Sequence, residues 1–184
     1  MVRRLLAAAF AVGLFAAAAP ADDTMLKVKV GDPFPDVALP AAQVDKIPGK
    51  KAGDTVKISD LKGKTVIVFF YPKALTPGCT VESCGFRDLS SRFPKDVVLI
   101  GASSDPVDLQ QKFIDEHKLP YALLADTDAK LISALGVKSN AKNNIPKRIT
   151  FVVGKDGTIA KIYDGKIDVK KHPEDVLKYV DALK

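Results

Sequence analysis

The strongest hydrophobic signal in the chain is a set of three continuous apolar runs, at residues 66–71, 96–102 and 148–153. Each run is rich in β-branched or aromatic residues, which is typical of a strand buried on both faces of a parallel or mixed sheet. The third run is followed by Asp156-Gly157, a dipeptide that favours a hairpin turn, and then by a strand pattern at residues 158–163. We therefore predict a central sheet with a closing hairpin.

Helical patterns separate and follow these strands. Pro106 suits the first position of one helix, Gly136 ends a second, and Pro173 opens a third. Residues 30–62 are rich in Pro, Gly and Lys and are expected to hold short edge strands and loops. The order predicts an α/β domain, a central mixed sheet flanked by helices. The side chains expected to face inward are Leu109, Phe113, Ile114, Leu131, Ile132, Leu135, Val176, Leu177, Val180 and Leu183.

The first 21 residues are expected to be a secretory signal peptide and not part of the fold. A basic start at positions 3 and 4 precedes an uncharged apolar run at 5–19, and Ala-Pro-Ala follows at 19–21. The alternative is an uncleaved membrane anchor, which is less favoured because a span usually needs about 18 or more apolar residues. We place cleavage after Ala21, so that residues 22–184 form one domain exported to the periplasm or the extracellular space.

Basic residues outnumber acidic ones by 28 to 22, which gives a formal net charge of +6. The lysines are scattered among acidic residues, Gly and Asn, without the interleaved aromatic residues that a nucleic-acid groove uses. We interpret this charge as a solvated basic surface and predict no nucleic-acid site.

The two cysteines, Cys79 and Cys84, lie only five positions apart. Small exported domains that need disulfide staples usually carry four or more cysteines, widely spaced. A bond between Cys79 and Cys84 would close a loop too small to constrain the unfolded chain much. Chemistry is therefore a better explanation of this pair than stabilisation.

Cys79 follows the end of the first apolar run, where ligands bind in open α/β sheets. Thr76 is a favourable N-cap and Pro77 suits the first helical position, so Cys79 is predicted to lie in the first turn of a helix. Unpaired backbone N–H groups and the positive end of the helix dipole stabilise a thiolate there. We expect Cys79 to be largely ionised at neutral pH.

The spacing of the two cysteines has a mechanical consequence. In a regular helix, residues five apart have Cα atoms about 8.5 Å from each other, whereas a disulfide tolerates at most about 7 Å. The sulfurs of Cys79 and Cys84 therefore cannot bond while the helix is intact, and any bond between them requires local unwinding.

The residues around this pair resemble a known family. Pro72-x3-Thr76-x2-Cys79 resembles the P-x3-T-x2-C active-site motif of peroxiredoxins, and residues 69–88 (FFYPKALTPGCTVESCGFRD) are similar to the peroxiredoxin Q, or bacterioferritin-comigratory-protein, branch. The likeness continues through GASSDPVDLQQKF, YALLAD and RITFVVGKDG to the last helix. It implies a thioredoxin-like fold and an AhpC/TSA-family thiol peroxidase that reduces hydrogen peroxide and organic hydroperoxides.

The resemblance implies a role for each cysteine. Cys79 matches the peroxidatic cysteine, which attacks a peroxide oxygen and becomes a sulfenic acid. The alternative for Cys79 is an inert buried thiol. Cys84 matches the resolving cysteine, which condenses with that sulfenic acid to an intramolecular disulfide. The alternative for Cys84 is a small apolar side chain on the inward helix face.

Three further residues match the family site. Thr76 matches the threonine whose hydroxyl contacts the thiolate and the peroxide, or is a plain N-cap. Arg148 matches the arginine beside the thiolate, where its charge favours the anion; the alternative is a surface charge at a strand end. Pro72 matches the proline that shields the sulfur from water, or simply terminates a strand. Glu82 has a secondary expected role, holding Arg148 in place.

The resemblance implies no metal, haem or flavin cofactor, a thioredoxin-like protein as electron donor, and a monomer or weak dimer. The sequence departs from the branch in a longer connection at residues 41–57 and in the signal peptide, since cytosolic residence is common in the branch. Because cytosolic thioredoxin could not reach an exported enzyme, the identity of the donor stays open.

Two competing functions remain at this point. A thiol–disulfide oxidoreductase of the same fold would use Cys-x2-Cys, whereas this chain has Cys-x4-Cys. A non-enzymatic metal-binding module would have to combine Cys79 and Cys84 with His117 and His172, whose spacing does not fit a zinc motif. Both histidines are expected to be solvated.

Overall fold

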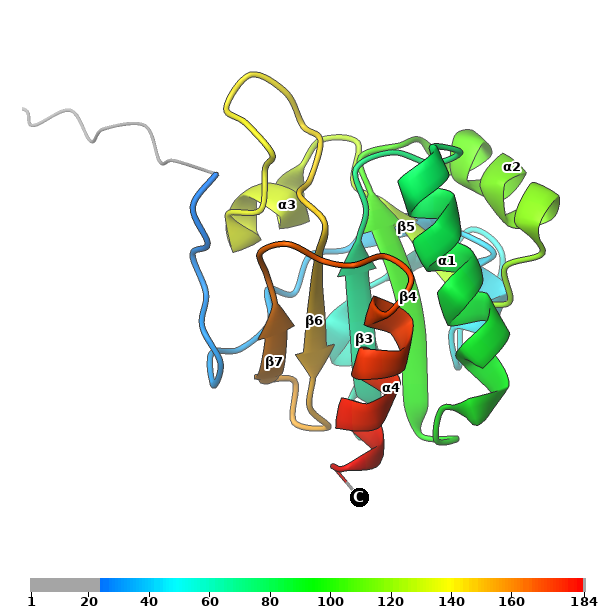
Figure 1. Cartoon of the computed structure of the whole chain (residues 1–184), viewed down its shortest axis with the longest axis vertical. Helices are drawn as coiled ribbons and strands as arrows, with labels where there is room; N and C mark the ends of the chain where they lie inside the picture. Colours follow the sequence, from blue (N-terminus) through cyan, green and yellow to red (C-terminus); the bar gives the residue numbers. More distant parts are fainter. Residues whose placement is uncertain (1–23, 184) are drawn as a thin grey trace, which may run out of the picture.

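The computed structural model describes residues 24–183, so the predicted signal peptide lies outside the described residues. Within this range the chain forms a seven-stranded sheet in the order β2-β1-β5-β4-β3-β6-β7, with helices on both of its faces (Figure 1). Among residues 24–183, no helix is long and apolar enough to cross a membrane.

The predicted succession of elements is confirmed, with boundaries shifted by a residue or two. The strands are β1 (Leu39–Ala42), β2 (Thr55–Val56), β3 (Thr65–Phe70), β4 (Val97–Ser103), β5 (Ala122–Ala125), β6 (Ile149–Val153) and β7 (Ile159–Tyr163). The helices are α1 (Pro77–Leu89), α2 (Val107–His117), α3 (Lys130–Leu135) and α4 (His172–Asp181). Short 3₁₀ turns lie at Val44–Lys46, Ile58–Leu61 and Ser90–Arg92.

The sheet is mixed, as predicted. β3, β4 and β5 run parallel to one another, which places their carboxyl ends at one edge. β6 pairs antiparallel with β3 on the other side, and β7 pairs antiparallel with β6. The β6–β7 turn contains Gly157 at φ 89°, and Asp156 accepts hydrogen bonds from the Thr158 backbone and hydroxyl. The expected Asp-Gly hairpin is therefore confirmed.

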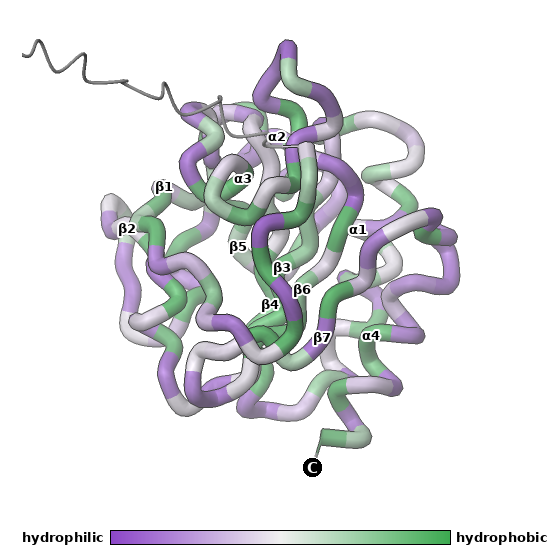
Figure 2. The backbone as a smooth tube through the Cα atoms, turned by 90° about the vertical axis from the view of Figure 1, so that its left-hand side faces the viewer, coloured by the Kyte–Doolittle hydropathy of each residue, from purple (hydrophilic) through white to green (hydrophobic). Residues whose placement is uncertain are grey.

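β3 lies between two hydrophobic cores and contributes side chains to both, and all of its residues are buried. Ile67 and Phe69, together with the following Tyr71, pack on the face covered by α1, α2 and α4. The alternate residues, of which Phe70 is the largest, pack on the opposite face with α3. Figure 2 shows hydrophobic segments through the centre of the molecule and hydrophilic ones mainly in the outer loops.

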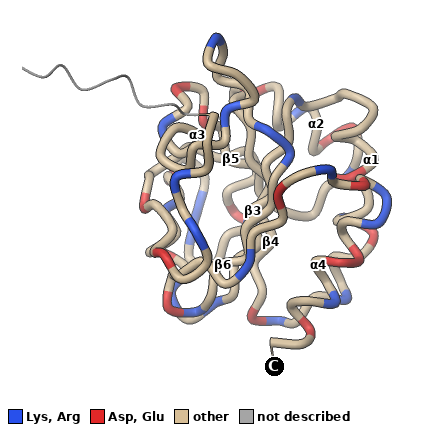
Figure 3. Tube along the Cα trace, turned by 60° about the vertical axis from the view of Figure 1, so that its left-hand side comes forward, with Lys and Arg blue, Asp and Glu red and all other residues tan. Residues whose placement is uncertain are grey.

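Three expectations about single elements or surfaces have clear outcomes. Pro106 has an extended backbone with ψ 159°, so α2 begins one residue later than predicted. Leu183 is 48% exposed and not buried, because it lies beyond the end of α4 at Asp181. Lys and Arg alternate with Asp and Glu over the loops and helices in Figure 3, in agreement with the scattered charge of the sequence.

Candidate active site

The buried strand β3 leads directly to Cys79. Tyr71 extends the pairing of β3 with β4, since its backbone N–H donates to the Ala102 carbonyl at 3.1 Å. A short loop then leads to α1, in which Pro77 is the first residue and Cys79 the third. Cys79 is 1% exposed. As predicted, its sulfur lies at the start of a helix, where backbone N–H groups lack helical partners and the helix dipole is positive.

A buried carboxylate, that of Asp105, holds the loop before α1 in place. Asp105 accepts hydrogen bonds from the Ala74 backbone N–H at 2.7 Å and from the Ser103 hydroxyl at 2.9 Å. Gln110 of α2 donates to the same hydroxyl at 3.0 Å. This network connects the loop to the carboxyl end of β4 and to the amino-terminal part of α2. Sequence reasoning missed it because Asp105 gave only the signal of a residue before a helix.

Arg148 contacts the sulfur from the neighbouring strand. The antiparallel register pairs Phe70 with Ile149, so the residue before β6 lies beside the residue after β3. The Arg148 Nη2 donates a hydrogen bond to the Cys79 Sγ at 3.2 Å. The Arg148 side chain is 18% exposed, so its charge is only partly screened by water. The predicted neighbourhood of Arg148 and Cys79 is therefore present.

Glu82 holds the other side of the same guanidinium. It lies three residues after Cys79 on α1, is fully buried, and forms an ion pair with the Arg148 Nη1. Burial raises the pKa of Glu82 to about 7, and Arg148 partly opposes this rise. Burial also works against the charged form of Arg148, but Glu82 and Cys79 together raise the pKa of Arg148. The expected contact between Glu82 and Arg148 is present, as an ion pair whose carboxylate is fully buried.

Thr76 and Pro72 lie in the loop before the helix. Thr76 occupies the N-cap position, as predicted, but its side chain does not cap α1. Its hydroxyl donates instead to the Lys73 carbonyl at 2.8 Å, which leaves the hydroxyl lone pairs available to another donor. Thr76 is therefore the N-cap residue by position and backbone conformation, without the capping hydrogen bond that its side-chain oxygen could accept. Pro72 follows Tyr71 and is half-buried.

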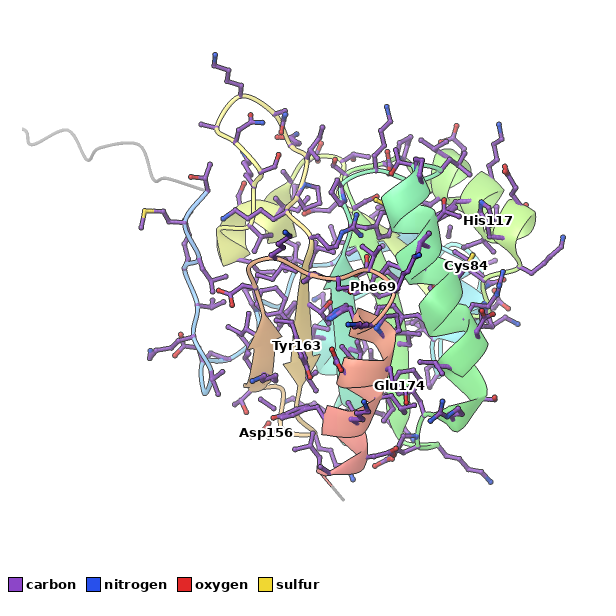
Figure 4. The ribbon with its side chains drawn as sticks, in the orientation of Figure 1. Phe69, Cys84, His117, Asp156, Tyr163 and Glu174 are labelled. Atoms are coloured by element: carbon purple, nitrogen blue, oxygen red, sulfur yellow. The ribbon has the colours of Figure 1, made fainter. Side chains whose placement is uncertain are left out.

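Cys84 lies on the same unbroken helix as Cys79. Both cysteines are free, and Cys84 is partly exposed whereas Cys79 is buried. Because α1 runs without interruption from Pro77 to Leu89, helix geometry keeps their Cα atoms about 8.5 Å apart. Figure 4 shows Cys84 on the ribbon of α1, with Phe69 in the sheet behind that helix. The arrangement is one in which the two sulfurs cannot bond.

The histidines offer no support for a metal module. His172 is 4% exposed, contrary to the expectation that it is solvated, because Phe86 and Tyr163 pack edge-on against its ring. Its Nε2 lies 2.8 Å from the Thr150 hydroxyl, and burial lowers the pKa of His172 to about 4. His117 is half-buried at the end of α2. In residues 24–183, no three His, Cys, Asp or Glu side chains gather as a metal site would require.

Comparison with known proteins identifies the family. The family model described as AhpC/TSA matches residues 30–162. The chain belongs to the AhpC/TSA family. Among curated relatives, it is 37% identical to peroxiredoxin Bcp of Bacillus subtilis (strain 168), over 83% of this chain and 95% of the relative. It is also 37% identical to the chloroplastic peroxiredoxin Q of Sedum lineare, over 72% of each chain.

Solved structures agree with this assignment. The crystal structure of peroxidoxin BcpB from Mycobacterium tuberculosis superposes with a TM-score of 0.73 at 32% identity, covering 85% of this chain and 98% of that one. The fold is therefore the thioredoxin-like fold of peroxiredoxins, and the chain is similar to the Bcp and Q types within the family. It is a thiol-dependent peroxidase.

Proposed function

We propose that Cys79 is the peroxidatic cysteine of this peroxidase and that Cys84 resolves it. The observation that carries the proposal is the Arg148 hydrogen bond to the Cys79 sulfur at the amino-terminal end of α1. Two sources of positive potential, the guanidinium and the helix start, act on one buried sulfur. Both favour the thiolate, which is the nucleophilic form.

In the first step, the Cys79 thiolate attacks the terminal oxygen of a hydroperoxide ROOH. An S–O bond forms, the O–O bond breaks, and the leaving alkoxide takes a proton to become an alcohol, or water when R is hydrogen. Cys79 becomes a sulfenic acid. Arg148 stabilises negative charge as it moves from sulfur to the leaving oxygen. Glu82 keeps the guanidinium in place through its ion pair.

Thr76 and Pro72 complete the proposed pocket. Since the Thr76 hydroxyl proton is directed to the Lys73 carbonyl, the oxygen can accept a hydrogen bond from the peroxide O–H and orient it toward the sulfur. Pro72 lies near the start of the same loop and, by its bulk, limits the access of water to the thiolate. Neither role requires a metal or an organic cofactor.

In the second step, the first turns of α1 unwind and the Cys84 thiol condenses with the sulfenic acid. The S–S bond forms, the S–O bond breaks, and water leaves. A thioredoxin-like dithiol protein then reduces the disulfide by thiol–disulfide exchange. The partial exposure of Cys84 supports its access to such a donor. Because Cys79, Glu82 and Arg148 come from one chain, a monomer or weak dimer suffices.

We also propose that residues 1–21 direct export, so that the donor is a periplasmic or extracellular protein. The basic start, apolar run and Ala-Pro-Ala sequence support this proposal. Expression of the full chain in a bacterial host, followed by fractionation and mass determination, tests it. A mature protein that starts at Asp22 in the periplasmic fraction is expected, whereas an uncleaved cytoplasmic protein would contradict it.

The assignment of the two cysteines is tested by free-thiol counting after one equivalent of hydrogen peroxide. The wild-type protein should lose both thiols and gain an intramolecular disulfide. Cys79→Ser should not react, whereas Cys84→Ser should form a sulfenic acid but fail to turn over with a dithiol donor. Retention of both thiols in the wild type would refute a peroxidatic Cys79, and normal turnover of Cys84→Ser would refute its resolving role.

A further inference from the structure

A buried tyrosine hydroxyl fastens α1 at the residue next to Cys84. Tyr121 lies just before β5 and is 4% exposed. Its hydroxyl donates to the backbone carbonyl of Ser83 at 2.7 Å. This carbonyl also belongs to the backbone ladder of α1, so the tyrosine uses its second lone pair. This hydrogen bond therefore connects the sheet to α1 at a residue between the two cysteines.

The ring of Tyr121 is fixed independently of its hydroxyl. It packs edge-on against Phe69, with ring centroids 5.8 Å apart, and Phe69 in turn stacks on Phe86 of α1 at 4.5 Å. Figure 4 shows Phe69 in the sheet behind the helix that carries Cys84. Burial raises the pKa of Tyr121 well above its usual range, so the hydroxyl keeps its proton and remains a donor.

The bond lies on the segment that must move in the proposed resolution step. Cys84 reaches Cys79 only if the helix between them unwinds, and Ser83 is the residue immediately before Cys84. When Ser83 moves, the Tyr121 hydroxyl loses its acceptor while its ring stays buried against Phe69. A buried hydroxyl without a partner is unfavourable, so this bond favours the intact helix over the unwound one.

We propose that Tyr121 is a positioning residue that holds α1 closed at Ser83 and thereby limits how fast Cys84 reaches the oxidised Cys79. This inference rests on the proposed resolving role of Cys84. Removing one neutral hydrogen bond of this kind shifts the equilibrium between intact and unwound helix by about two- to tenfold. The hydroxyl therefore sets the lifetime of the sulfenic acid.

That lifetime decides between two fates of Cys79. The sulfenic acid either condenses with Cys84 and releases water, or its sulfur attacks a second hydroperoxide ROOH. In the second case an S–O bond forms, the O–O bond breaks, the alcohol ROH (or water) leaves, and Cys79 becomes a sulfinic acid. Slow unwinding favours the second fate at high peroxide concentration. Tyr121 is thus predicted to make the enzyme more sensitive to overoxidation.

The test compares Tyr121→Phe, which keeps the buried ring, with Tyr179→Phe as a matched control. The Tyr179 hydroxyl donates to the Ala160 carbonyl at 3.0 Å and therefore joins α4 to β7, not to α1. Because the chain contains no tryptophan, resolution is followed by rapid acid quench, alkylation and intact-mass analysis. In Tyr121→Phe, disulfide formation should be about two- to tenfold faster, and half-maximal sulfinic acid formation should need proportionally more peroxide.

A second measurement does not depend on turnover. In the reduced protein, hydrogen exchange of the amides at residues 84–88 should be about two- to tenfold faster in Tyr121→Phe than in the wild type or in Tyr179→Phe. Equal exchange and equal resolution rates in all three proteins would overturn the role of Tyr121. A wild type that forms no Cys79–Cys84 disulfide would instead overturn the resolving role of Cys84, so the two failures are distinguishable.

Discussion

Glu82 gives the sharpest test of how this site is stabilised. It is fully buried on α1, and its partner is Arg148, which also contacts Cys79. The pKa of Glu82 is raised from 4.5 to about 7, chiefly by burial and against the effect of Arg148. Glu82→Gln preserves the shape and an acceptor oxygen for the guanidinium but removes the ionisation. The pH dependence of stability should therefore differ between the two proteins.

The sign and size of this difference follow from proton linkage. Because the pKa of Glu82 is raised in the folded protein, the folded state binds this proton more tightly than the unfolded state. Glu82 thus contributes stability that is present below about pH 4.5 and is lost as the pH rises through about 7. The difference between those two values corresponds to about 3 kcal/mol in the free energy of unfolding.

Urea unfolding at several pH values measures this quantity, with the reduced protein followed by far-ultraviolet circular dichroism. The free energy of unfolding of the wild type minus that of Glu82→Gln should fall by about 3 kcal/mol between about pH 4.5 and pH 7.5. The subtraction cancels other titrating groups, including His172. Glu116→Gln, at a side chain that is 55% exposed, is the control. A difference constant to within about 0.5 kcal/mol would refute the buried environment assigned to Glu82.

Two further predictions concern Arg148 and the glycine that ends α3. Arg148→Ala should lower the rate of Cys79 oxidation by hydrogen peroxide by about a hundredfold. Arg148→Lys should have an intermediate rate, because a single ammonium cannot contact both Glu82 and the sulfur as the guanidinium does. An unchanged oxidation rate of Arg148→Ala in competition kinetics would contradict this. Gly136→Ala should destabilise the protein by about 1–3 kcal/mol in urea unfolding. The reason is that Gly136 has φ 72° and that an added Cβ would lie 1.8 Å from the Met25 carbonyl oxygen. An unfolding midpoint equal to that of the wild type would show that the segment before β1 can move aside.

The hydrophobic pattern of the sequence is sufficient to predict the central sheet. Continuous apolar runs give β3, β4 and β6 because these strands are buried on both faces, and Asp156-Gly157 marks the hairpin through its turn preference. β1 and the edge strand β2 could be predicted only as short elements within residues 30–62. They are defined by pairing with distant segments, such as Ala41 with Leu124, and such partners leave no local pattern.

The site was predictable in part for the same reason. The position of Cys79 follows from local features, a strand end, an N-cap position and a proline. The neighbourhood of Arg148 came from the family resemblance, and no local pattern announces it, because 69 positions separate it from Cys79. Tyr121 was missed because its role depends on a contact 38 residues away. His172 was misjudged because exposure depends on which rings pack around a side chain.

In the proposed mechanism, the same helix must satisfy two opposed requirements. An intact first turn is needed to activate the Cys79 sulfur, and unwinding is needed to bring Cys84 to it. Oxidation itself relieves this conflict, since the thiolate that Arg148 attracts becomes a neutral sulfenic acid. Arg148 then retains its ion pair with Glu82 but loses the charge that drew it to the sulfur. The electrostatic hold on the helix start is therefore strongest before the peroxide reacts and weakest when Cys84 has to move.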